Sequence, residues 1–110
     1  MSYCHKDLAS GRWKRMSFVE QMANIGSEVE RALNWKSRNN TVYSHQAAER
    51  ALELLDLTVE GVRGFSRLKE LIRVREAIAD YFFGTNQFIS SDMSWKKYFS
   101  YFAYAMRGNR

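Results

Sequence analysis

The chain contains no proline and only one cysteine among its 110 residues. Proline breaks helix interiors, so its absence favours an all-helical protein. The single cysteine, Cys4, excludes an internal disulfide and any multi-cysteine metal motif, and it favours a reducing compartment. No apolar run approaches the roughly 18 residues of a membrane span, and residues 1–16 lack the apolar segment of a secretory signal. We therefore expect a cytoplasmic protein that does not cross a membrane.

Motifs for catalysis and cofactor binding are also missing. The sequence has no Walker loop, no Gly-x-Ser-x-Gly elbow and no Gly-x-Gly-x-x-Gly turn. Cys4 precedes His5, but adjacency alone does not make a positioned catalytic pair. The only other histidine is His45, so the Glu-x-x-His motifs of di-iron helical bundles are absent. We predict no enzyme activity, no metal and no cofactor.

An acidic stripe nevertheless follows one face of the second predicted helix, at spacings of 4, 3 and 4. Its members are Glu49, Glu53, Asp56 and Glu60. Without histidine ligands, we interpret the stripe as ion-pairing with neighbouring helices, an arrangement that fixes register more than it adds stability. The candidate basic partners are Arg31, Arg73 and Arg75.

What the sequence does contain predicts four helices in one domain, since 45% of its residues are hydrophobic and 26% are charged. Ser17 and Glu20 fit a capping box at the start of the first helix, and an Asn39-Asn40 turn follows that helix. The second helix begins between Thr41 and Ser44 and ends at Gly61.

The last two helices follow from the same signals. Ser66 caps the third helix and Gly84 ends it, and the fourth runs from Ser90 or Ser91 to about Arg107. Apolar residues recur at helical spacing in the first three. The expected stripes are Phe18, Met22, Ile25, Val29 and Ala32; Ala48, Ala51, Leu52, Leu55 and Val59; and Leu68, Leu71, Ile72, Ile78 and Phe82. We expect Phe88 and Ile89 to pack beneath the loop that joins the third helix to the fourth.

The predicted fold is an all-α, antiparallel up-down four-helix bundle over residues 17–110, because short loops join consecutive helices. Residues 1–16 show no helical period and are interpreted as a basic, partly flexible arm, from which Trp13 docks on the bundle.

The fourth helix has two aromatic faces. Trp95, Phe99, Phe102 and Met106 share one face, and Tyr98, Tyr101 and Tyr104 share another. A bundle helix needs one apolar stripe, so the second face indicates either a wide contact within the bundle or a protein–protein interface. Trp35 ends a polar stripe on the first helix that is either solvated or part of a subunit contact. The predicted oligomer interface comprises Trp35, Tyr98, Tyr101 and Tyr104.

Positive charge gathers at the two ends of the chain. The net charge is +5; residues 1–16 contribute +3, residues 95–110 contribute +4, and the remainder contributes −2. These ends either only aid solubility or contact a polyanion. In an up-down bundle both ends and the second loop meet at one pole. The predicted nucleic-acid-binding residues there are Lys6, Arg12, Lys14, Arg15, Arg63, Arg67, Arg107 and Arg110.

Several runs resemble a family of small uncharacterised bacterial four-helix-bundle proteins. The matching runs are Asn24–Val29, Trp35-Lys36, Arg50–Thr58, Arg67–Glu70, Arg73–Glu76 and Asp80–Phe82. The wider group includes proteins encoded in intervening sequences of ribosomal RNA genes and the accessory variability determinant of diversity-generating retroelements. The resemblance implies a bundle fold and a homopentameric ring. For the retroelement relative, it implies binding of nucleic acid and a reverse transcriptase.

Together these patterns predict a non-enzymatic homo-oligomer, with five subunits favoured, that binds RNA or DNA through a basic pole, RNA being favoured. The alternative is a protein–protein interaction scaffold whose basic ends bind no nucleic acid.

Overall fold

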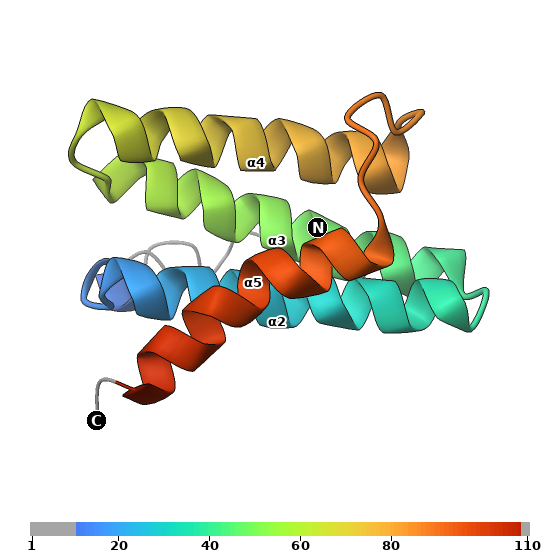
Figure 1. Ribbon diagram of the computed structural model, residues 1–110, viewed down its shortest axis with the longest axis horizontal. Helices are drawn as coiled ribbons and strands as arrows, with labels where there is room; N and C mark the ends of the chain where they lie inside the picture. The colour runs from blue at the N-terminus through green and yellow to red at the C-terminus, as the bar shows by residue number, and fades with distance from the viewer. Residues whose placement is uncertain (1–10, 109–110) are drawn as a thin grey trace.

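The computed structural model describes residues 11–108, and four long helices contain most of them (Figure 1). The helices are α2 (Phe18–Ser37), α3 (Thr41–Gly61), α4 (Phe65–Phe83) and α5 (Asp92–Gly108). Residues 11–108 contain no β-strand. The predicted all-α class is therefore confirmed.

Local capping chemistry explains where these helices begin. The Ser17 hydroxyl accepts from the Glu20 backbone N–H at 3.1 Å, and the Glu20 carboxylate accepts from the Ser17 backbone N–H at 2.9 Å, which completes the predicted capping box. Asn40 caps α3 by accepting from the Tyr43 backbone N–H. The prediction that Ser66 caps the next helix is wrong. The turn is made at Gly64, whose φ of 97° suits only glycine well, so Ser66 already lies in the first turn of α4.

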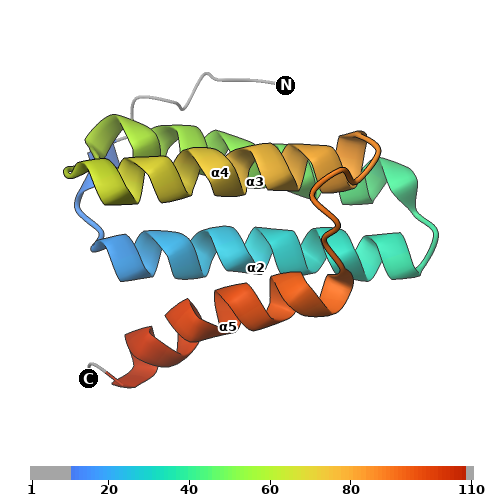
Figure 2. The same cartoon turned by 45° about the horizontal axis from the view of Figure 1, so that its top comes forward.

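Consecutive helices alternate in direction, as the colours in Figure 1 show. Helix α2 packs against both α3 and α5, and α4 packs against α3. Helices α4 and α5 do not pack along one another, and α5 diverges from the other three towards its C-terminal end (Figure 2). The four long helices are confirmed, whereas the antiparallel up-down four-helix bundle stays a prediction.

A single glycine permits the close crossing of α2 and α5. A Cβ atom added at Gly26 would lie only 2.8 Å from the Phe99 Cβ atom and 3.0 Å from its ring. Gly26 is buried, and Phe99 of α5 packs directly over its backbone. The absence of a side chain at this position therefore sets how closely α5 approaches α2.

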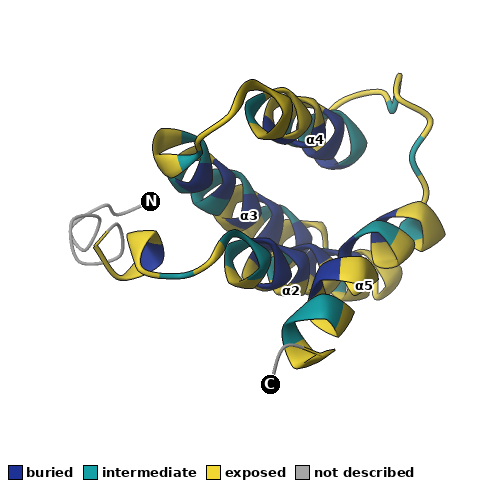
Figure 3. Cartoon of the chain, turned by 60° about the vertical axis from the view of Figure 1, so that its left-hand side comes forward, coloured by how far each residue is buried: buried dark blue, intermediate teal, exposed yellow. Residues whose placement is uncertain are grey.

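The buried side chains form one core on the inner faces of the helices, which are dark blue in the end-on view of Figure 3. The predicted stripe of the first helix is buried at Met22, Ile25, Val29 and Ala32, while Phe18 is partly buried. Core positions of α4 are less well predicted. Ile72 is 46% exposed, and the buried residues include Val74 and Ala77 instead.

Residues 11–14 form a short helical turn that places Trp13 on the core. Its side chain is only 6% exposed, and its indole N–H donates to the Thr58 hydroxyl of α3 at 2.9 Å. The Trp13 carbonyl accepts from the Gln21 side chain at 2.8 Å. This segment is therefore attached to both α2 and α3, as we expected of Trp13.

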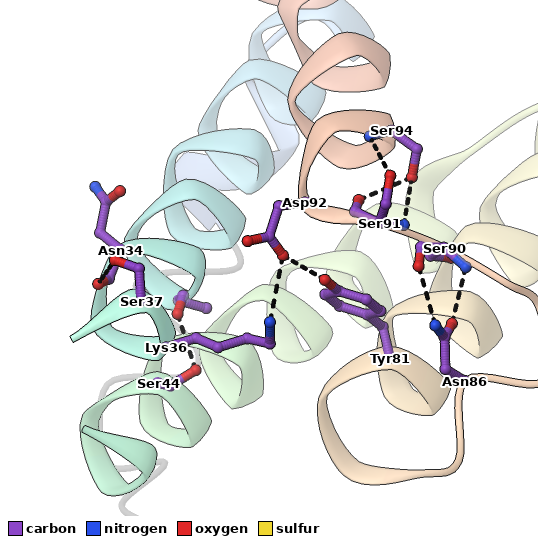
Figure 4. Close-up of polar contacts among 11 residues, drawn as sticks. Asn34, Lys36, Ser37, Ser44, Tyr81, Asn86, Ser90, Ser91, Asp92 and Ser94 are labelled. Carbon is purple, nitrogen blue, oxygen red and sulfur yellow. Dashed lines mark hydrogen bonds and ion pairs between the residues drawn. The ribbon is translucent and has the colours of Figure 1, made fainter. Parts of the chain in front are cut away.

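The loop between α4 and α5 is held by polar groups rather than by its apolar side chains. The Asp80 carboxylate accepts from the backbone N–H groups of Gln87 and Phe88 at 2.9 and 3.0 Å. The Asn86 side chain forms two hydrogen bonds with the Ser90 backbone (Figure 4). These bonds fix the backbone with Phe88 51% and Ile89 86% exposed, so the prediction that both pack beneath the loop is wrong.

A second polar cluster fixes the start of α5. The Asp92 carboxylate accepts from the Tyr81 hydroxyl of α4 and lies 3.4 Å from the Lys36 Nζ atom of α2 (Figure 4). Burial and the hydrogen bond to Asp92 both raise the pKa of Tyr81. This cluster holds the start of α5 against the ends of α2 and α4. Helix α5 therefore diverges only after this first turn.

Candidate nucleic-acid interface

Three predicted basic residues line one hollow at the end of the molecule where α2 begins, α3 ends and α4 begins. Lys14 comes from the segment before α2, Arg63 from the turn after α3, and Arg67 from the first turn of α4. The hollow measures about 770 Å³, and Glu60 is its only acidic lining residue among residues 11–108. We call this space the basic hollow; Phe18 at the start of α2 also lines it.

Among the residues that the structure describes, the basic side chains of the hollow have no carboxylate partner. Within residues 11–108, no carboxylate lies within 4.0 Å of the charged groups of Lys14, Arg63 or Arg67. Gly64 gives α4 no side-chain cap, and the first turn of α4 contains no acidic residue. The backbone N–H groups of that turn therefore add positive potential beside Arg63 and Arg67.

Three other predicted basic residues, Arg12, Arg15 and Arg107, are described by the structure and do not line the hollow. Arg12 and Arg15 are exposed on either side of Trp13 and Lys14 but do not line the hollow. Arg107 lies near the end of α5, with its guanidinium 5.9 Å from the centre of the Tyr104 ring. Helix α5 has diverged by this point (Figure 2), so the structure does not bring Arg107 into the hollow. Lys6 and Arg110 lie outside the described residues.

A groove of about 420 Å³ is lined by the start of α2, the first half of α4 and the middle of α5. Among the described residues, half of its lining is aromatic, and the rest includes two basic residues and one acidic residue. It is lined by Phe18, Val19, Arg67, Glu70, Lys97, Tyr98, Tyr101 and Phe102. We call it the aromatic groove. Arg67 and Phe18 line both the aromatic groove and the basic hollow, so the two surfaces are continuous.

The predicted interface residues fall into separate environments. Tyr98 is partly buried against the core and lines the aromatic groove, and its hydroxyl donates to the Glu70 carboxylate at 2.6 Å. Burial, and then the bond to Glu70, raise the pKa of Tyr98. Tyr101 and Tyr104 are 67% and 76% exposed. Trp35 is partly buried against Tyr43, at the end of α2 where α3 begins, so it does not join the tyrosines of α5 in one surface.

The acidic stripe forms one of the predicted pairs with a neighbouring helix. The Arg75 guanidinium lies 2.7 Å from the Asp56 carboxylate, and both side chains are substantially exposed. Exposed pairs contribute about 0–1 kcal/mol, so this contact aligns α3 with α4 more than it stabilises the fold. Arg31 instead pairs with Glu28 within α2 at 3.1 Å.

Sequence reasoning did not single out the aromatic groove. In the sequence, Lys97 belongs to the basic segment 95–110 and Phe18 to the apolar stripe of the first helix. The spacing of Lys97 and Tyr101, four residues apart on one helix, places both on the same face and could have drawn attention to them. Their relation to Phe18 and Glu70, however, depends on the angle of α5.

Residues 11–108 contain no cluster of three histidine, cysteine, aspartate or glutamate side chains that could hold a metal ion. Within that same part of the chain, no helix is both long enough and apolar enough to cross a membrane. No family model, curated protein or solved structure matches this chain.

Proposed function

We propose that this chain is a non-enzymatic protein that binds nucleic acid, RNA first of all, through the basic hollow. The observation that carries the proposal is the convergence of Lys14, Arg63 and Arg67 from three chain segments on one hollow. Among the described residues, Glu60 is the single acidic residue that lines it. Clustered, unpaired basic side chains are the electrostatic footprint of phosphate binding. The uncapped start of α4 adds backbone N–H donors to the same surface.

Binding of this kind reads the phosphate backbone rather than the bases. The hollow presents positive charge but no element that could enter a groove of a duplex, so we expect little sequence preference from it. Displaced counterions make such binding weaken steeply as salt is added. In this proposal the basic residues position a strand, and any further selectivity must come from neighbouring surfaces.

The proposal includes assembly into a closed ring of antiparallel four-helix bundles, with five subunits favoured by the resemblance. Support comes from the outermost stripe of α5, where Met93 and Tyr104 are 77% and 76% exposed. A ring would repeat the basic hollow once per subunit around one rim. A cytoplasmic location accords with the single cysteine. A reverse-transcriptase partner rests on the resemblance alone.

The test compares RNA binding by three proteins at low salt, using fluorescence anisotropy and a labelled RNA. Changing Lys14, Arg63 and Arg67 to glutamine should weaken binding and make its salt dependence shallower by about 2 log units per log unit of salt, since each single-strand phosphate contact contributes about 0.7. A matched control changes three exposed basic residues elsewhere. Its substitutions are Arg38→Gln, Arg73→Gln and Lys96→Gln.

The control should keep most of the wild-type affinity, because it removes the same charge without touching the hollow. Equal losses in both variants would show that only net charge matters, and absence of binding by all three proteins would remove the proposal. The interaction scaffold would then remain, supported by the exposed Met93, Tyr101 and Tyr104 on α5.

A further inference from the structure

We infer that the aromatic groove binds an unpaired base of a single-stranded nucleic acid whose phosphates lie in the basic hollow. This inference rests on the proposed function and adds a preference for single strands. Its starting point is the continuity of the two surfaces, since Arg67 and Phe18 line both of them. A strand that places phosphates beside Lys14 and Arg63 therefore has an aromatic surface next to its sugar–phosphate backbone.

The groove contains one exposed aromatic ring, Tyr101, which packs against a buried aromatic ring. Tyr101 is 67% exposed, and the buried ring of Phe102 meets it edge-on with centroids 5.1 Å apart. Phe102 in turn packs edge-on against Phe18 at 6.2 Å. The Tyr98 hydroxyl is held by Glu70, which fixes the side of the groove that faces α4. Base–aromatic stacking is a sequence-tolerant way to hold single strands, because every base has a π face.

The charged residues around the groove indicate where a phosphate would bind and where a base would bind. The Arg67 guanidinium lies 4.4 Å from the centre of the Phe18 ring, between the hollow and the groove, and its donors suit a phosphate. Glu70 is the acidic residue of the groove. Its carboxylate would repel a phosphate there but tolerates a neutral base. Lys97 lines the groove from α5, and in this inference its ammonium group contacts the next phosphate along the strand.

A paired duplex cannot use this groove. Its bases are stacked and hydrogen-bonded to one another, so a ring such as Tyr101 can reach a base only after the base is unpaired. The groove volume of about 420 Å³ lies within the roughly 300–1,000 Å³ of typical small-molecule sites, which is adequate for one base. The basic hollow alone would bind single strands and duplexes through their charge. The preference for single strands therefore comes from the aromatic groove.

The experiment measures binding of a labelled, unstructured RNA of about 12 nucleotides, alone and annealed to its complement, by anisotropy at low salt. The wild type should bind the single strand more tightly than the duplex. Tyr101→Ser should weaken single-strand binding by roughly 5- to 150-fold, the equivalent of losing one base–aromatic stack. Duplex binding should be unchanged. Tyr101→Phe should restore single-strand binding. Tyr104→Ser removes an equally exposed tyrosine of α5 that does not line the groove, so it should leave single-strand binding intact.

Light scattering on the same variants separates this role from an assembly role. If single strand and duplex bind the wild type equally, or if Tyr101→Ser and Tyr104→Ser have the same effect, the inference is overturned while the proposed function stands. Loss of the oligomer in Tyr101→Ser without a change in single-strand preference would also overturn it. Absence of binding to either RNA form would remove the proposed function and the inference together.

Discussion

Gly26 sets the distance between α2 and α5, so a methyl group at this position should be costly. An alanine Cβ would lie 2.8 Å from the Phe99 Cβ atom, which cannot rotate away without moving the backbone of α5. Overpacking of this kind costs about 1–3 kcal/mol, whereas alanine is about 1 kcal/mol better than glycine in a helix. We expect Gly26→Ala to lower the free energy of unfolding by up to about 2 kcal/mol in urea denaturation.

Gly61 provides the matched control. It is the last residue of α3, and no atom lies within 4 Å of the Cβ position there. Gly61→Ala should be neutral or slightly stabilising. A Gly26→Ala protein as stable as the wild type would show that α5 can adjust its position at no cost.

The Trp13 indole makes a buried hydrogen bond to Thr58 that joins the segment before α2 to α3. Trp13→Phe should lower the free energy of unfolding by about 1–3 kcal/mol, because it removes both the bond and part of the buried ring. A double-mutant cycle with Thr58→Val should give a coupling energy of about 0.5–1.5 kcal/mol. Additive effects of the two substitutions would contradict a direct interaction.

At the scale of the elements, the stability of the loop of residues 84–91 should depend on pH through the Asp80 carboxylate. Hydrogen bonds from the backbone N–H groups of Phe88 and Gln87 lower the pKa of Asp80. A lowered folded-state pKa means that the stabilisation is present above the carboxyl group's ordinary pKa and is lost as pH falls through the lowered value. Hydrogen exchange at Gln87 and Phe88 should therefore become less protected, after correction for intrinsic rates, in strongly acidic solution.

Asp80→Asn should reproduce this loss of protection at neutral pH, because an amide oxygen can replace only part of what the carboxylate accepts. Asp56→Asn, on α3, is the control and should not affect the loop amides. Protection of Gln87 and Phe88 that is unchanged in Asp80→Asn would contradict the account of the loop.

Two helix ends were predictable because their signals are local, whereas the start of α4 lies at the Gly64 turn and not at the predicted Ser66 cap. Ser17 and Glu20 cap α2 through bonds between residues three apart, and Gly61 ends α3, as expected. The exposure of Ile89 and the angle of α5 were not predictable in this way. They depend on the Asp80 bonds across the loop and on the approach of Phe99 to Gly26, which are contacts between elements.

At the scale of the whole molecule, topology predicted part of the candidate site. Alternating helix directions bring the start of α2, the end of α3 and the start of α4 together, and Lys14, Arg63 and Arg67 meet there. Arg107 does not join them, because α5 diverges before its last turn. The aromatic groove depends on the same divergence of α5. Residue spacing along the sequence does not give the angle between helices, so it could not reveal the groove.

Assembly is a whole-molecule prediction that light scattering on a size-exclusion column can check. The wild type should form one closed oligomer, with five subunits favoured, and Tyr104→Glu should yield smaller species because it introduces charge on the exposed stripe of α5. Ile89→Glu, at an apolar position that is 86% exposed on the loop, should leave the oligomer unchanged. A wild-type monomer at all concentrations would contradict the ring.

The central claim, that the basic hollow binds nucleic acid, is tested most directly by the salt dependence of RNA binding by the unmodified protein. Affinity for a short single-stranded RNA would be measured from about 50 to 200 mM salt. Three phosphate contacts, one for each basic residue of the hollow, predict a slope of log K against log salt of about −2 or steeper. No binding at the lowest salt, or a slope near zero, would contradict the account.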